Sequence, residues 1–186
     1  MSSHDAIAAV ISALESEGIA YMMVGAFSSN AYGIPRSTND ADVVVKLGEG
    51  DLTRLMESLG EDFQLDRQLR LETITHTVRN VVTFLPTAFD IELFRLSEDP
   101  HDEERFRRRT RHRMSNPDCE IWIPTAEDVI LQKLRWARRK DIDDARNVLA
   151  VCFETLDCEY MSQWASRHDT ADLLQQLKAE VQSIGD

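Results

Sequence analysis

The sequence predicts an α/β fold, of the α+β type, in which a mixed sheet is flanked by helices and followed by a helical C-terminal portion. Two observations predict this class. Short apolar runs of strand length alternate with helical periodicity over the first two-thirds of the chain, and beyond about residue 115 the pattern is helical. We therefore expect a core over residues 1–115 and a helical portion over residues 116–186 that packs on it.

The first part of the chain begins with an amphipathic helix and a buried strand. Apolar residues recur at helical spacing over 4–17, and Gly18 ends this helix. The apolar run 19–24 reads as a strand that leads into Gly25. Further strands are expected at 41–46, 78–85 and 88–94, and further helices at 26–32 and 51–59.

Four helices are expected in the C-terminal portion. The first begins at Thr125, whose hydroxyl can cap the helix while Asp128, three residues on, returns the bond. The helical patterns cover residues 125–138, 141–153, 157–167 and 169–182.

Composition and charge exclude several classes of protein. Hydrophobic residues make up 42% of the chain and charged residues 29%, which is typical of a globular protein, and no apolar run could span a membrane. The N-terminus lacks the pattern of a secretory signal, and the three cysteines lack zinc-site spacing, so we expect reduced thiols and a cytoplasmic protein. The net charge of −12 disfavours binding to a long nucleic acid.

One segment departs from the acidic trend. Residues 105–113 hold six arginines and a histidine. This strip could bind phosphate, but we favour an amphipathic connection whose arginines pair with nearby acids.

The candidate chemistry lies in acidic residues on two expected strands. Because strand side chains alternate between faces, Asp40 and Asp42 point the same way. Two carboxylates that close repel each other unless a cation lies between them, and a hard divalent ion is the natural partner. Asp90 and Glu92 repeat the spacing, and Asp90 would complete a three-carboxylate cluster if the two strands are neighbours.

A glycine precedes the second expected helix. Gly25 lies between a strand and that helix, where backbone N–H groups can approach a phosphate near the positive end of the helix dipole. The sequence therefore combines a phosphate-binding turn with a metal-binding cluster.

This combination resembles the nucleotidyltransferase superfamily of the polymerase-beta type. The family pattern is an apolar residue, Gly and Gly or Ser, then an acid–apolar–acid triplet and a later acid between apolar residues. It is matched by Val24-Gly25-Ala26, Asp40-Ala41-Asp42 and Phe89-Asp90-Ile91, with Ala26 as a departure. Residues 33–40 and 124–134 are similar to two motifs of small bacterial AbiEii-like and minimal nucleotidyltransferases, "Gly-x-Pro-Arg-x-Thr-x-Asp" and "Pro-x-x-Glu-Asp-x-Ile-Leu-x-Lys-Leu".

The resemblance implies a fold, a reaction and a set of site residues. It implies magnesium-dependent (or manganese-dependent) transfer of a nucleoside monophosphate from an NTP to an unidentified acceptor hydroxyl, in a toxin–antitoxin or phage-defence setting. Asp40, Asp42 and Asp90 would bind the metal and act in catalysis. The residues implied in nucleotide or phosphate binding are Gly25, Ala26, Ser28, Arg36, Thr38 and Lys133.

Two other functions stay open on the sequence. The chain could be an inactive protein of the same fold that acts by binding a protein partner, and Ala26, which has no hydroxyl, favours this reading. It could also be a nucleic-acid-binding module built on the helical tail and the strip 105–113, which predicts salt-sensitive binding without divalent ions.

Overall fold

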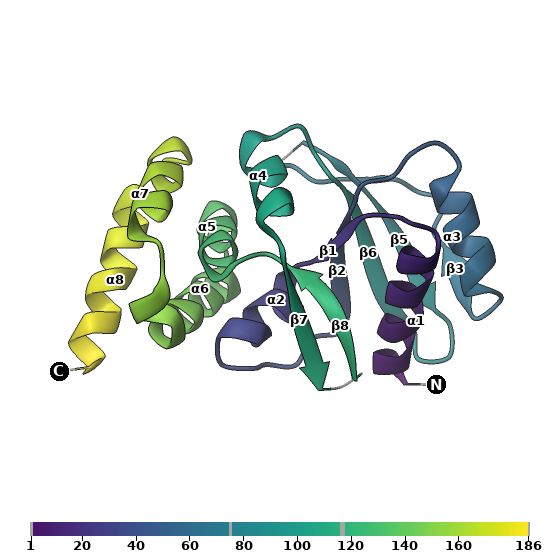
Figure 1. Cartoon of the computed structure of the whole chain (residues 1–186), viewed down its shortest axis with the longest axis horizontal. Helices are drawn as coiled ribbons and strands as arrows, with labels where there is room; N and C mark the ends of the chain where they lie inside the picture. Colours follow the sequence, from purple (N-terminus) through teal and green to yellow (C-terminus); the bar gives the residue numbers. More distant parts are fainter. Residues whose placement is uncertain (1, 75, 116–117, 186) are drawn as a thin grey trace.

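The computed structural model of the chain describes residues 2–74, 76–115 and 118–185 (Figure 1). Helices cover both faces of the main mixed sheet. The C-terminal helices α5 to α8 pack together at one end of the molecule (Figure 1). The helices are α1 (Ser3–Ser16), α2 (Gly25–Tyr32), α3 (Asp51–Leu59), α4 (Pro100–Arg108), α5 (Ala126–Trp136), α6 (Arg139–Cys152), α7 (Cys158–Arg167) and α8 (Ala171–Gly185). The mixed α/β class expected from the sequence is confirmed.

The main sheet has the strand order β1-β2-β6-β5-β3, with β4 paired to β5. Its strands are β1 (Tyr21–Met23), β2 (Asp40–Val45), β3 (Phe63–Leu65), β4 (Arg70–Leu71), β5 (Val78–Phe84) and β6 (Phe89–Arg95). β2 and β6 run parallel, whereas the other pairs are antiparallel. The three strands expected near 19–24, 41–46 and 88–94 are therefore neighbours in one sheet, which is the condition set for Asp90 to lie near Asp40 and Asp42.

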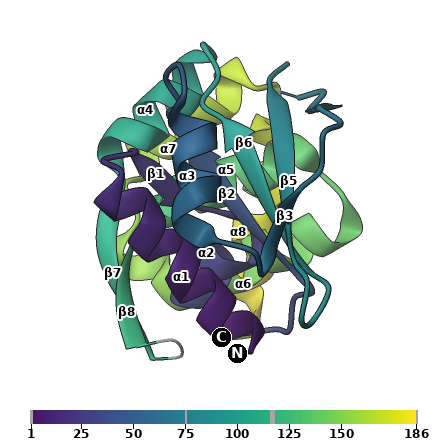
Figure 2. The ribbon, with the colours of Figure 1, turned by 90° about the vertical axis from the view of Figure 1, so that its right-hand side faces the viewer.

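The two faces of this sheet are covered by different helices. On one face, α1 and α3 pack on alternate residues such as Val43, Val45 and Ile91, in the largest hydrophobic cluster (Figure 2). On the other face, Val44 and Phe94 belong to a smaller cluster that α4 closes. Since side chains alternate along a strand, the acids of β2 and β6 share this second face.

The C-terminal helices have a hydrophobic cluster of their own. It begins with Val129 on α5 and extends to α8. α2 contacts both α5 and α6, so the helix that begins at Gly25 joins the sheet to this helical part. All four helices expected here exist, and Thr125 caps the first by accepting a hydrogen bond from the Asp128 N–H at 3.4 Å. The boundary near residue 115 stays a prediction.

A helix and two antiparallel strands that the sequence pattern did not predict lie within residues 100–115 and 118–123. α4 is followed by the antiparallel strands β7 (Thr110–Ser115) and β8 (Asp118–Ile123), which form a separate two-stranded sheet. Ile121 and Ile123 of β8 are buried in the cluster with α1, so the hairpin packs on the core. Residues 110–115 lack the apolar residues that usually mark a strand, because polar residues, among them two arginines, occupy most of its positions. The sequence pattern therefore did not indicate a strand there.

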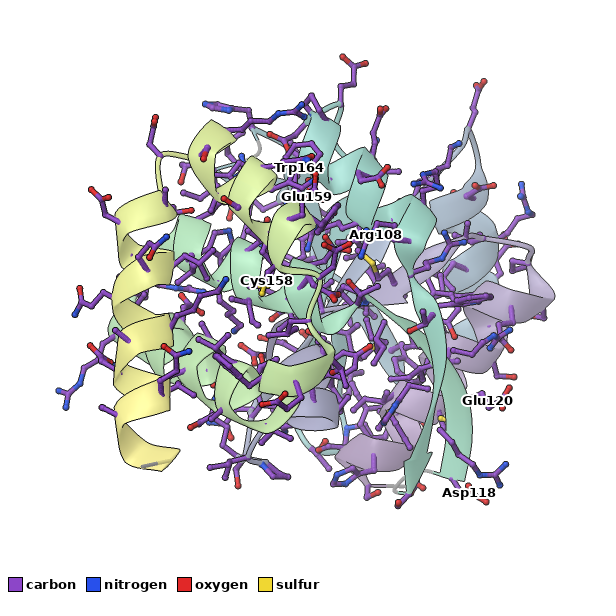
Figure 3. The ribbon with its side chains drawn as sticks, turned by 60° about the vertical axis from the view of Figure 1, so that its left-hand side comes forward. Arg108, Asp118, Glu120, Cys158, Glu159 and Trp164 are labelled. Carbon is purple, nitrogen blue, oxygen red and sulfur yellow. The ribbon has the colours of Figure 1, made fainter. Side chains whose placement is uncertain are left out.

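The arginine strip lies on α4 and β7, and its side chains are mostly paired with acids. Ion pairs join Arg105 to Asp102, Arg107 to Glu104, Arg108 to Asp128, Arg111 to Glu15 and Arg113 to Asp118. Arg108, labelled in Figure 3, is the last residue of α4. Its guanidinium also stacks on the ring of Tyr160 on α7, 3.7 Å from the ring centroid. Arg109 instead packs over aromatic rings. The favoured interpretation, pairing with acids, is confirmed, and the strip gives no support to a nucleic-acid-binding surface.

Within the described ranges, no helix is long and apolar enough to cross a membrane. The three cysteines, Cys119, Cys152 and Cys158, are free thiols.

Candidate active site

The register of two parallel strands brings four acids together. Asp40 of β2 pairs with Asp90 of β6, and Asp42 pairs with Glu92. Residues paired in register project from the same face of a sheet, so all four carboxylates lie on the face opposite α1 and α3. The predicted condition, that Asp90 shares a face with Asp42, is met. The structure adds Glu92, which is the direct cross-strand neighbour of Asp42.

Gly25 makes room for the Asp42 carboxylate. A Cβ atom added at Gly25 would lie 2.0 Å from Asp42 Oδ2, far inside van der Waals contact. Gly25 also has a φ of +62°, a conformation that glycine adopts without strain. It is the first residue of α2, so the Asp42 carboxylate lies against the N-terminus of this helix. The glycine expected to approach a phosphate therefore also seats a carboxylate.

Two of the four acids, Asp42 and Glu92, bind a proton more tightly than an ordinary carboxylate. Burial raises the pKa of Asp42 to about 6, and the negative charges of Asp40 and Glu92 contribute. The pKa of Glu92 is raised as well, first by burial and then by Asp40, although Arg79 opposes the shift. A divalent cation bound beside Asp42 and Glu92 would favour their charged forms and so lower both pKa values.

Two of the four acids have partners on β5. Asp90 accepts a hydrogen bond of 2.7 Å from the Thr83 hydroxyl, and the Arg79 guanidinium lies 3.1 Å from Glu92. Among the described residues, no three His, Cys, Asp or Glu side chains are gathered closely enough to hold a metal ion. The backbone therefore positions the acids, and their side chains would have to turn toward a shared ion.

The serine hydroxyls of α2 are hydrogen-bonded to the backbone of the same helix. Ala26 is buried, and the hydroxyls of Ser28 and Ser29 both donate to the Gly25 carbonyl, at 3.1 and 3.0 Å. Ser28 lines the pocket beside Gly25, so its oxygen can still accept a hydrogen bond there. As a donor to phosphate, Ser28 would have to give up its present bond.

Lys133 lies in a buried ionic network rather than in solvent. Its Nζ lies 3.1 Å from Asp141 and 2.8 Å from Asp144, and its side chain is only 7% exposed. Arg36 binds the same Asp144 with two hydrogen bonds of 2.8 and 2.9 Å. Lys133 and Arg36, which the resemblance implies in nucleotide or phosphate binding, are thus both paired with acids of α6.

This network joins the segment before the acid triplet to the C-terminal helices. Arg36 precedes β2, whereas Lys133 lies on α5 and Asp144 on α6. Burial opposes ionisation of Asp144, but hydrogen bonds from Arg36 and Lys133 lower its pKa, so it is a carboxylate at neutral pH. Thr38 lies nearer the acids and donates a 2.7 Å hydrogen bond to Asp40, which orients that carboxylate.

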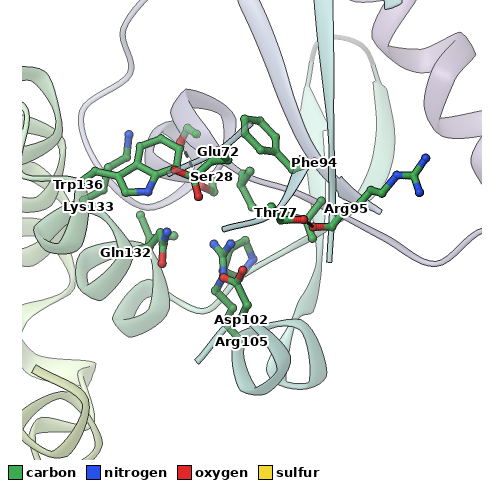
Figure 4. Close-up of a pocket in the computed structure, with 15 residues that line it drawn as sticks. Ser28, Glu72, Thr77, Phe94, Arg95, Asp102, Arg105, Gln132, Lys133 and Trp136 are labelled. Atoms are coloured by element: carbon green, nitrogen blue, oxygen red, sulfur yellow. Dashed lines mark hydrogen bonds and ion pairs between the residues drawn. The ribbon is translucent and has the colours of Figure 1, made fainter. Parts of the chain in front are cut away.

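A pocket opens beside these groups, between the sheet and α5 (Figure 4). Gly25, Ser28 and Lys133 line one part of it, and Val44 and Phe94 provide an apolar wall. Across the pocket, α4 presents an ion pair of Asp102 and Arg105, 2.7 Å apart. Lys133 is near enough to Asp42 to oppose the rise in the pKa of that acid. None of the four acids lines this pocket, and Gly25, which lines it and adjoins Asp42, connects the two.

The architecture is that of the nucleotidyltransferase fold, as three solved structures show. The solution structure of the antibiotic-resistance factor ANT(2'')-Ia matches with a TM-score of 0.58 and 14% identity, over 94% of this chain and 96% of that one. The crystal structure of ANT(2'')-Ia in complex with adenylyl-2''-tobramycin matches with a TM-score of 0.60 and 12% identity, over 91% and 98%.

The third structure is an antigenic nucleotidyltransferase-like protein from Paracoccidioides brasiliensis, with a TM-score of 0.56 and 18% identity over 96% of this chain and 94% of that one. No protein-family model matches the chain, and no curated protein matches its sequence. The nucleotidyltransferase fold expected from the resemblance is confirmed, whereas the closer likeness to AbiEii-like proteins stays a prediction.

Sequence reasoning missed three groups of this site. Glu92 was placed on the right face but given no role, and the acids that bind Lys133, Asp141 and Asp144, were not singled out. Alternation along β6 was a signal for Glu92. No local signal pointed to Asp141 and Asp144, because they lie on the helix after the one that carries Lys133.

Proposed function

We propose that the protein transfers a nucleoside monophosphate from an NTP to an acceptor hydroxyl and requires Mg²⁺, with Mn²⁺ as a substitute. The observation that carries this proposal is the register of β2 and β6, which aligns two pairs of acids beside the N-terminus of α2. The nucleotidyltransferase fold supports the same class of reaction. A nucleotide is thus the proposed ligand, and the acceptor is unassigned.

The acids fit a hard divalent cation by their chemistry. Asp40 and Asp42 would hold the ion, and Asp90 would be the third ligand that the sequence predicts. Glu92, which is paired in register with Asp42, lies next to this set. Carboxylate oxygens are the donors that Mg²⁺ prefers, and burial together with the negative charges of Asp40 and Glu92 raises the pKa of Asp42. A bound Mg²⁺ would neutralise charge on the triphosphate.

The reaction needs a proton acceptor and a phosphate cradle. The acceptor oxygen attacks the α-phosphorus, the bond to the β-phosphate oxygen breaks, and pyrophosphate leaves. We assign the proton of the acceptor hydroxyl to Asp90, at the exposed end of the acid pairs. Backbone N–H groups at Gly25 and Ala26 would bind phosphate at the start of α2, with Ser28 and Lys133 lining the same pocket.

Titration of each NTP into the protein by calorimetry, with and without Mg²⁺, tests the proposal. Wild type should bind at least one NTP only when the ion is present, and Asp40→Asn should abolish this binding. Asp62→Asn is the matched control, because Asp62 is an exposed acid outside the site. Labelled NTPs mixed with a cell extract should then reveal a labelled acceptor. NTP binding that Asp40→Asn leaves unchanged would contradict the assigned role.

A second candidate function is a catalytically weak or inactive protein that binds a protein partner. Ala26 favours it, because the position where the family pattern has Gly or Ser has no hydroxyl and is buried. One half of a toxin–antitoxin pair is an example of such a protein, and the toxin–antitoxin or phage-defence setting is proposed for the enzyme as well. Wild type and Ala26→Ser that both fail to bind any NTP, together with co-purification of a defined partner, would favour it over the enzyme.

A further inference from the structure

One arginine of the strip 105–113 differs from the rest in having no acid partner. The other five arginines of the strip form ion pairs with carboxylates. Arg109 forms none with any described acid, and its buried Nε has no hydrogen-bond partner among those residues. Its Nη1 donates to the Phe106 carbonyl, and its guanidinium packs over the rings of Phe106 and Trp122. In a chain with a net charge of −12, such a guanidinium is an exception.

The charges nearest to Arg109 do not compensate its own charge. Burial lowers the pKa of Arg109, and the positive charge of Arg111 lowers it further. Tyr21 alone opposes this shift, and no carboxylate of the described ranges contributes to it. An arginine side chain nevertheless stays protonated at neutral pH. Arg109 is therefore a cation without a counter-ion, and an anionic ligand could supply one.

A second cation without an ion pair lines the same pocket. The pocket has a volume of about 380 Å³, and Lys46, which follows β2, is exposed there without an acid partner in the described part of the chain. Arg107 lines the pocket too, although Glu104 holds its guanidinium at 2.6 Å. Glu103 is the single acid among the described lining residues. Three cations thus meet one acid, so the pocket of Lys46 and Arg109 suits an anion.

Three strand ends border this pocket. Ala20 precedes β1, Lys46 follows β2 and Leu96 follows β6. Backbone hydrogen bonds of 2.9 Å join Lys46 to Ala20 and Leu96 to Val45. Ala20 and Leu96 pack against the small hydrophobic cluster that α4 closes, so they give the pocket an apolar side. Asp40 begins β2 at its other end, about 20 Å away by the rise of a strand, and the pocket is therefore separate from the candidate active site.

We propose that the pocket of Lys46 and Arg109 binds a phosphate monoester. Such a group carries close to two negative charges at neutral pH and offers three acceptor oxygens. The planar guanidinium of Arg109 suits phosphate, and the Lys46 ammonium adds a point charge. The organic part of the ligand would rest on the apolar side that Ala20 and Leu96 form. This binding uses none of the four acids, so it needs no divalent ion.

Titration of inorganic phosphate into the nitrogen-labelled full chain tests the site by NMR, with a chelator present and chloride at equal ionic strength as the reference. Phosphate should shift the amide signals of Lys46 and Arg109 and the Nε–H signal of Arg109. Arg109→Gln should weaken binding roughly ten- to a hundredfold, and Lys46→Gln roughly two- to fivefold. Arg113→Gln, in an exposed arginine of the same strip that pairs with Asp118 outside the pocket, is the matched control and should bind as wild type does.

Phenyl phosphate distinguishes an ester from free phosphate. Contact of its ring with Ala20 and Leu96 should tighten binding roughly fivefold, for about 40 Å² of apolar surface removed from water. Asp40→Asn should bind both compounds as wild type does. Thermal melting establishes that each variant is folded. Because Lys46 is exposed, Lys46→Gln keeps the test valid even if the loss of the Arg109 packing unfolds Arg109→Gln.

Four outcomes would overturn the proposal. Phosphate that shifts no signal does not bind, and shifts at Gly25 and Ala26 in place of Lys46 and Arg109 would put the phosphate at the start of α2. Unchanged affinity in Lys46→Gln and Arg109→Gln would remove the pocket from consideration. Phenyl phosphate that binds no more tightly than inorganic phosphate would contradict the monoester. None of these results bears on the proposed function, which depends on Mg²⁺ and the acids.

Discussion

Replacing Asp42 with asparagine should stabilise the protein in the absence of divalent ions. In the folded chain this carboxyl lies against the N-terminus of α2 and beside Asp40 and Glu92, and its pKa is raised to about 6 from 3.8. An asparagine has nearly the same shape without the charge, so the repulsion disappears while Gly25 still accommodates the side chain. The proposed metal-binding role of Asp42 requires the charge that causes this repulsion.

The magnitude follows from the shift in pKa. Two pKa units correspond to about 3 kcal/mol, and partial exposure of Asp42 reduces this to about 2 kcal/mol. For a chain of this size, that is a rise in Tm of roughly 4–8 °C. Because the folded pKa is the higher one, the folded state binds the proton more tightly between about pH 4 and pH 6. The free energy of unfolding of the wild type therefore falls by this amount as pH rises through that window.

The assay is thermal unfolding in a chelator at several values between pH 4 and pH 8. The difference between Asp42→Asn and wild type should be near zero at pH 4 and reach its full value above pH 6. Other titrating groups occur in both proteins and largely cancel in this difference. Asp62→Asn, in an exposed acid, should change stability by less than about 0.5 kcal/mol. Asp42→Asn that is less stable than wild type at pH 8 would refute the reasoning.

The same melts with millimolar Mg²⁺ test the metal site. The ion should raise the Tm of wild type, because it binds the folded state and relieves the carboxylate repulsion. Asp42→Asn should not respond. A wild type that melts at the same temperature with and without Mg²⁺ and NTP would contradict the proposed site.

Four further changes have defined outcomes. Gly25→Ala should destabilise the protein by at least about 1–2 kcal/mol in urea unfolding, from the positive φ and the approach of Asp42, and Asp42→Ala in the same chain should restore only part of this. Lys133→Met should cost about 3–5 kcal/mol, since it leaves two buried carboxylates without their shared cation; an unchanged urea midpoint would contradict the network. Ala26→Ser should tighten Mg²⁺-dependent NTP binding roughly tenfold in calorimetry, and no gain would mean that the backbone alone holds the phosphate. Burial lowers the pKa of His168 to about 4, so stability should fall as pH drops from about 6.5 to 4, and His168→Gln should reduce this fall in acid melts.

Local periodicity determined much of this protein. The helix over 51–59 has the bounds that its apolar spacing predicts, and Thr125 caps α5 as its position before an acid indicated. Alternation along a strand placed Asp40 with Asp42 and Asp90 with Glu92. These predictions succeed because the period of a strand or helix and the capping of its ends depend on residues at most a few positions apart.

Only the tertiary structure decided which groups meet. The register of β2 against β6 makes Glu92 the neighbour of Asp42, and a shift of one residue would have turned the acids of β6 to the opposite face. Lys133 is buried because α6 brings Asp141 and Asp144 to it, which no feature of its own helix foretold. Strand register and helix packing join residues far apart in the chain, and their energies depend on the whole assembled core, so a local pattern carries no record of them.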